Sequence, residues 1–200
     1  QGAAAARSRA CLSHCMREGG PLEQTKEDTS VPISPIPQGV YPSVTALDPK
    51  ALRAKGITLV LADLDNTLAP YKVLEPNPEV AAWKEALERE GIQLFILSNS
   101  RKPGRAQKYA EALGVPFQGH SGKPKKAGYL RAMERMGRKP EQTAMVGDQI
   151  FTDILGARRS GVKALMVEPI ELAGNPGRYI RYAVEEPFRL LGRRNNRRTL

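Results

Sequence analysis

The chain has 200 residues, with 31 lysines and arginines against 21 aspartates and glutamates, which gives a formal net charge of +10. This length allows one domain with a good core, or a smaller domain with arms, and no apolar run approaches the roughly 20 residues needed to span a bilayer. The basic excess predicts an anionic partner, either nucleic acid, an anionic membrane or a phosphorylated substrate.

Residues 1–38 lack hydrophobic periodicity and end in alternating prolines, so we expect a disordered or extended arm. Cys11 and Cys15 lie in this arm with His14 between them. Three ligands do not complete the usual four of a zinc site, and two reduced thiols are the favoured interpretation. Reduced thiols and the lack of a secretory signal predict a cytoplasmic protein, with peripheral contact at the inner face of the membrane as a further option.

From residue 39 to about residue 174, short apolar runs alternate with segments of helical periodicity, which predicts one domain. Strands are expected at 57–62, 92–97, 115–117, 143–146 and 162–167. Helices are expected at 47–55, 77–90, 103–113, 124–136 and 150–160. Such alternation implies right-handed crossovers and an α/β fold with a mainly parallel sheet. Trp83 has the spacing of a core residue.

Residues 175–200 form a basic tail with seven arginines against two glutamates. Four apolar side chains fall near one helical face: Ile180, Val184, Phe188 and Leu191. Arginines surround that face: Arg178, Arg181, Arg189 and Arg193. Such a segment could rest on an anionic membrane, although Pro187 interrupts the pattern. The alternative is a solvated helix that packs on the domain.

The segment 63–67, Asp-Leu-Asp-Asn-Thr, directly follows the first apolar run. Two carboxylates at the end of a buried strand are costly unless a cation or hydrogen-bond donors face them. Open parallel sheets bind their ligands at the carboxyl ends of the strands. A binding site is therefore favoured over a capped turn, which is the structural alternative.

Polar groups follow the other strands as well. Ser98 and Asn99 end the second strand, Asp148 follows the strand before Gly147, and Asp153 comes five residues later. Lys123 lies at the start of a helix. Because the carboxyl ends of parallel strands converge, we expect these side chains to meet at one edge of the sheet.

Four segments together resemble the motifs of the haloacid dehalogenase superfamily: 63–67, Leu97-Ser98-Asn99, Gly122-Lys123-Pro124 and 147–153. The resemblance covers about residues 39–171. It implies a Rossmann-type three-layer sandwich and an Mg²⁺-dependent phosphomonoester hydrolase that forms an aspartyl-phosphate.

The chemistry suggests a role for each residue. Asp63 would be the nucleophile and Asp65 the general acid and base. Mg²⁺ would be held by Asp63, Asp148 and the backbone carbonyl of Asp65. Phosphate binding is assigned to three residues: Ser98, Asn99 and Lys123. Asp153 would orient Lys123 or a metal-bound water. Lys125 and Lys126 are less suited than Lys123, because Lys123 directly precedes the proline that starts the helix.

The loops after the first and second motifs are too short for a cap domain, so a phosphate attached to a large molecule is favoured. Pro42-Ser43-Val44, Lys55-Gly56-Ile57 and Gly161-Val162, together with the four motifs, resemble the YqeG family of small capless phosphatases, which is related to mitochondrial phosphatidylglycerophosphate phosphatases. That likeness implies a phospholipid headgroup as substrate. The alternatives are a phosphatase of nucleotides, nucleic-acid ends or other small esters, and an RNA- or assembly-binding protein on the same scaffold.

Overall fold

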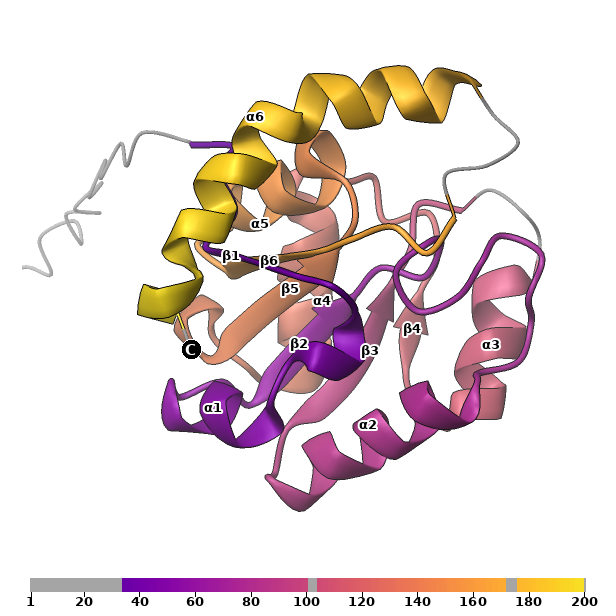
Figure 1. The fold of residues 1–200 in the computed structure, drawn as a ribbon. Coiled ribbons are helices and arrows are strands. Elements are labelled where there is room, and N and C mark those ends of the chain that lie inside the picture. The colour runs from indigo at the N-terminus through magenta and orange to yellow at the C-terminus, as the bar shows by residue number, and fades with distance from the viewer. Residues whose placement is uncertain (1–33, 101–103, 172–175, 200) are drawn as a thin grey trace, which may run out of the picture. The chain divides into compact units, whose positions relative to one another are not determined.

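The computed structural model describes residues 34–100, 104–171 and 176–199, which form one sheet with helices around it (Figure 1). The strands are β1 (Gly39–Tyr41), β2 (Leu59–Ala62), β3 (Gln93–Leu97), β4 (Phe117–Gln118), β5 (Thr143–Gly147) and β6 (Lys163–Val167). All six are parallel, in the order β1-β6-β5-β2-β3-β4. The predicted α/β fold with a mainly parallel sheet is confirmed.

The strand order reverses at β2, which lies between β3 and β5. Val60 faces Leu94 on one side and Ala144 on the other. The chain proceeds from β2 to β3 and β4, then crosses back to β5 and β6. Ligands of parallel sheets bind outside the carboxyl ends at such a reversal point. The segments that follow β2 and β5 are therefore neighbours at the expected site.

The helices cover both faces of the sheet, because alternate strand residues point in opposite directions. Val60 belongs to one buried cluster and Leu61 to the other. The first cluster also includes residues of α1 (Pro49–Ala54), α2 (Pro78–Arg89) and α3 (Arg105–Leu113). The second includes residues of α4 (Lys126–Met136) and α5 (Leu155–Arg159). The result is the expected three-layer sandwich.

Local signals set the helix boundaries. Asn77 caps α2 by accepting a hydrogen bond from the N–H of Val80 at 2.8 Å, and Pro78 occupies the first helical position. Trp83 of α2 is buried, as predicted, and its Nε1 donates to the carbonyl of Leu47 at 3.0 Å.

Two features differ from the sequence-based prediction. The edge strand β1 was not predicted, since three residues are too few to show a period. The single helix expected at 150–160 is instead a π-helical turn, η3 (Ile150–Ile154), followed by α5. Two short 3-10 turns, η1 (Val44–Ala46) and η2 (Pro140–Gln142), complete the fold. The other boundaries agree with the prediction to within about two residues.

The basic tail forms one helix, α6 (Pro176–Thr199), which continues through Pro187 and bends along its length (Figure 1). It covers the edge of the sheet. The side chain of Asn196 accepts from the N–H of Val40 at 2.8 Å and donates to the Val40 carbonyl at 2.6 Å. An edge strand that would otherwise present free backbone groups is thereby satisfied.

Two residues of the predicted amphipathic tail face the domain. Phe188 is half-buried against the second cluster, and Arg189 is buried. Both lie on the side of α6 that meets the domain, where Phe188 packs on the exposed Phe151 of η3.

Between β2 and α2 the described chain holds no helix or sheet strand, and between β3 and α4 it holds only α3 and β4. No cap domain interrupts these described segments, as expected. None of the helices in the described ranges combines the length and the hydropathy needed to cross a bilayer.

Candidate active site

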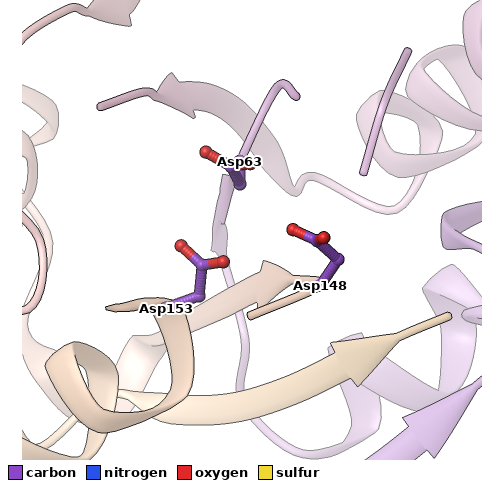
Figure 2. A group of neighbouring side chains, drawn as sticks. All are labelled: Asp63, Asp148 and Asp153. Carbon is purple, nitrogen blue, oxygen red and sulfur yellow. The ribbon is translucent and has the colours of Figure 1, made fainter. Parts of the chain in front are cut away.

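Three buried aspartates meet at the carboxyl ends of β2 and β5 (Figure 2). Asp63 follows β2, Asp148 follows β5, and Asp153 belongs to η3. One carboxylate oxygen of each lies within 4.8 Å of the others, and in Figure 2 the three carboxylates face a common space. Their approach depends on Gly147, since a Cβ there would lie 2.4 Å from Cγ of Asp153.

Lys123 joins two of these aspartates. Its buried Nζ lies 2.5 Å from Oδ1 of Asp63 and 2.7 Å from Oδ1 of Asp153. Lys125 and Lys126 are exposed. Of the three lysines considered, the structure therefore brings only Lys123 into the site, where it contacts Asp153. The role of Asp153 in orienting Lys123 or a metal-bound water stays a prediction.

Asn99 positions the loop that carries Lys123. Its Nδ2 donates to the Lys123 carbonyl at 2.9 Å, while its Oδ1 accepts from the Lys123 N–H at 2.9 Å and from Oγ of Ser121 at 2.8 Å. Ser98 is buried beside it, and its Oγ accepts from the N–H of Ser100 at 3.0 Å. Direct phosphate binding by Ser98 and Asn99 stays a prediction.

Crowded carboxylates dominate the electrostatics of the site. Burial raises the pKa of Asp63 to about 7; Lys123 opposes this rise, and Asp153 adds to it. Burial also raises the pKa of Asp148 well above its usual range, and the charges of Asp153 and Asp63 add to it. Burial by itself would lower the pKa of Lys123, but the carboxylates of Asp153 and Asp63 raise it. One ammonium thus faces three buried carboxyl groups.

This donor set fits a hard divalent cation. Oδ1 of Asp148 is buried and has no hydrogen-bond partner among the described residues. The other oxygen, Oδ2, lies 3.8 Å from Nη2 of Arg181. A buried carboxylate oxygen without a partner is costly, and Mg²⁺ prefers carboxylate and carbonyl oxygens. The carboxylates of Asp63 and Asp148 therefore suit such a cation, and the backbone carbonyl of Asp65 as a third ligand stays a prediction.

The side chain of Asp65 contacts a residue that the sequence analysis missed. Nε of Arg105 donates to Oδ1 of Asp65 at 2.8 Å. The same buried guanidinium donates through Nη2 to the Pro70 carbonyl at 2.8 Å and through Nη1 to the Val73 carbonyl. Arg105 is the first residue of α3, where the helix dipole disfavours a cation. That unfavourable position is the signal that could have identified it.

The basic tail supports the loop of Asp148. Arg189 of α6 donates through Nη2 to the Asp148 carbonyl at 3.2 Å and through Nη1 to Oε2 of Glu168 at 3.0 Å. Glu185 pairs with Arg189 and accepts from the N–H of Ile150 at 3.0 Å. The spacing of Glu185 and Arg189, one helical turn apart, is the sequence signal for this pair.

A family model described as haloacid dehalogenase-like hydrolase matches residues 26–161. The chain belongs to the haloacid dehalogenase-like hydrolases, and the resemblance seen in its four motifs is confirmed.

Three relatives that match about two thirds of the chain are phosphatases by name. The probable phosphatase YqeG of Bacillus subtilis is 30% identical over 135 residues, which cover 68% of this chain and 78% of that protein. Phosphatidylglycerophosphate phosphatase 1, chloroplastic, of Chlamydomonas reinhardtii is 30% identical over 149 residues, 70% of this chain and 55% of that protein. The chloroplastic/mitochondrial enzyme of Arabidopsis thaliana is 30% identical over 139 residues, 65% of this chain and 40% of that protein. The predicted relation to these phosphatases is confirmed, although the chain spans about half or less of the two plant and algal proteins.

Proposed function

We propose that this hydrolase is an Mg²⁺-dependent phosphomonoesterase whose substrate is phosphatidylglycerophosphate. The observation that carries the chemistry is the buried group of Asp63, Asp148 and Asp153 around the ammonium of Lys123. A phosphate dianion can approach an anionic nucleophile only where positive charge offsets the repulsion.

In the first step, a carboxylate oxygen of Asp63 forms a bond to phosphorus while the bond from phosphorus to the leaving oxygen breaks. Asp65 donates its proton to that leaving oxygen. In the second step, water attacks phosphorus and gives a proton to Asp65, and the bond between phosphorus and Asp63 breaks. Inorganic phosphate and the free alcohol are the products.

The other residues hold charge and position. Lys123 offsets the negative charge on the transferring phosphoryl group, and Ser98 donates to a phosphoryl oxygen. Asp153 fixes the ammonium of Lys123 at 2.7 Å. When bound, Mg²⁺ supplies Lewis-acid stabilisation of the phosphoryl oxygens, with Asp63, Asp148 and the Asp65 carbonyl as its protein ligands.

Two observations support a lipid substrate. The first is the name of the algal and plant relatives, which are phosphatidylglycerophosphate phosphatases. The second is the lack of a cap in the described segments between β2 and α2 and between β3 and α4, because a site without a lid accepts a headgroup that stays attached to a large body.

The test is phosphate release from phosphatidylglycerophosphate in mixed micelles with Mg²⁺, compared with release from nucleotides and sugar phosphates. Asp63→Asn should lower kcat at least about 10³-fold, because it removes the nucleophile. Asp48→Asn is the matched control, since asparagine also caps a helix and Asp48 lies at the start of α1, outside the site.

Each outcome separates one part of the proposal. Turnover of nucleotides or sugar phosphates without turnover of the lipid contradicts the substrate. Equal activity of Asp63→Asn and Asp48→Asn contradicts the assignment of the nucleophile. No Mg²⁺-dependent release from any monoester contradicts the enzymatic proposal and favours a binding protein on this scaffold.

A further inference from the structure

The large apolar side chains that are exposed in the described part of the chain gather around the catalytic edge and on α6. Four lie in segments beyond the carboxyl ends of β2, β5 and β6: Val73, Leu74, Phe151 and Ile170. Five lie on α6: Tyr179, Ile180, Val184, Leu190 and Leu191. The remaining one, Leu130, is on α4. Scattered exposed apolar residues are ordinary, but a contiguous set marks an interaction surface.

The faces of α6 are reversed relative to an ordinary surface helix. Its inner face carries the buried charges of Glu185 and Arg189. Its outer face carries Ile180, Val184 and Leu191, whose positions four and eleven residues apart lie along one stripe. Ile180 is 68% exposed and Val184 is 55% exposed. A helix packed on a core normally turns its apolar stripe inward, so a second apolar medium is implied on the outer side.

The four exposed apolar side chains beyond the strand ends, here called the apolar rim, lie in segments joined to the loops of the site. The ring of Phe151, three residues after Asp148, meets the ring of Phe188 edge-on with centroids 6.1 Å apart, which links η3 to α6. The N–H of Ile170 donates to the carbonyl of Asn66 in the first motif at 3.1 Å. Val73 belongs to the loop held by Arg105. Whatever covers the rim therefore lies against the site.

We infer that the apolar rim and the outer stripe of α6 form one surface that docks on an anionic lipid bilayer. The inference rests on the proposed function in one respect, since a headgroup that stays in the bilayer must meet the site at the membrane surface. The basic charge of α6 indicates which partner covers this surface. Apart from the buried pair of Glu185 and Arg189, residues 176–199 contain six arginines against one glutamate, and apolar side chains beside arginines suit the interface of an anionic membrane.

The test is co-sedimentation of the full chain with vesicles of phosphatidylcholine alone and with vesicles that also contain phosphatidylglycerol. The wild-type protein should sediment with the anionic vesicles. Ile180→Glu combined with Val184→Glu should weaken that binding about tenfold or more, because two charges replace apolar groups at the interface. Leu130→Glu is the matched control: Leu130 is 50% exposed but lies on α4, and its binding should equal that of the wild type.

Turnover of a soluble ester, p-nitrophenyl phosphate, should stay unchanged in all three proteins, which shows that the variants fold. Failure of the wild type to bind anionic vesicles, or equal binding by the double variant, overturns the docking surface. A change of oligomeric state in the double variant without lipid, together with unchanged vesicle binding, assigns the stripe to contact between copies and also overturns it. Because sedimentation needs no turnover, vesicle binding without hydrolysis of any ester would count against the proposed function alone.

Discussion

At the scale of single residues, the active site depends on side chains that hold the reacting groups as much as on those groups themselves. Arg105 is buried and joins Asp65 to the carbonyls of Pro70 and Val73. Its planar guanidinium donates to these acceptors from three different nitrogens in a fixed fork, a spread that the single nitrogen of an ammonium cannot reproduce. We therefore regard Arg105 as a positioning residue for Asp65, the proposed general acid.

Arg105→Lys keeps the charge but should lower kcat about tenfold to a hundredfold, because Asp65 is no longer held in one orientation. KM for a soluble ester should change less than kcat. The measurement is steady-state kinetics across pH, in which the variant should also show a shifted profile for kcat. An unchanged kcat and pH profile would mean that Arg105 serves only to hold the loop.

At the scale of secondary-structure elements, α6 acts as part of the site rather than as an appendage. Arg189 of α6 connects Glu185, Glu168 and the carbonyl of Asp148, and its guanidinium lies 4.1 Å from the ring centre of Tyr182. Buried ion pairs are costly to break by removing one partner, since the other charge then stays buried alone.

Arg189→Met should therefore lower the free energy of unfolding by about 3–5 kcal/mol. Arg194→Met, at an exposed position of the same helix, should change it by less than about 0.5 kcal/mol. Chemical denaturation of the two variants checks this, and Glu185→Gln added to Arg189→Met should recover part of the loss. Similar stability of both single variants would show that the network is dispensable.

At the scale of the whole molecule, the fold gathers negative charge at one point of a chain whose net charge is +10. In the metal-free protein, burial raises the pKa of Asp63 to about 7, above the unfolded value of 3.8. The folded state then holds a proton that the unfolded state has released, so this group's contribution to stability is lost as the pH rises through about 7. A bound cation would replace that proton, so the gain in stability from cation binding would be larger at high pH.

Addition of Mg²⁺ should accordingly raise Tm more at pH 8 than at pH 6. At an Mg²⁺ concentration about a hundred times Kd, the rise at pH 8 should be about 5–10 °C. Asp148→Asn should remove most of this effect, and thermal unfolding followed by circular dichroism measures it. An equal rise at both pH values would contradict displacement of a proton from Asp63.

Most of the fold, and the polar residues that meet at the carboxyl edge of the sheet, could be predicted from the sequence. Asp63, Asp65, Asp148 and Lys123 each follow a strand or precede a helix, and the parallel topology brings such positions to one edge of the sheet. Short-range signals also set the helix boundaries, as the Asn77-Pro78 cap of α2 illustrates. Alternation of strands and helices is a local pattern, which is why residues near in sequence were enough to reveal it.

The tertiary structure decided what distant segments do to one another. Arg105 reaches Asp65 across 40 residues and Arg189 reaches Asp148 across 41, and neither distance leaves a trace in local periodicity. The rotation of α6 about its own axis, which buries Arg189 and exposes Ile180, is likewise set by packing against the sheet edge. The sequence by itself indicated the haloacid dehalogenase-like family and the polar residues that meet at the sheet edge, because its motifs are local. The contacts of Arg105 and Arg189 that support those residues, and the exposure of the apolar rim, were decided by packing that forms only when the sheet is assembled.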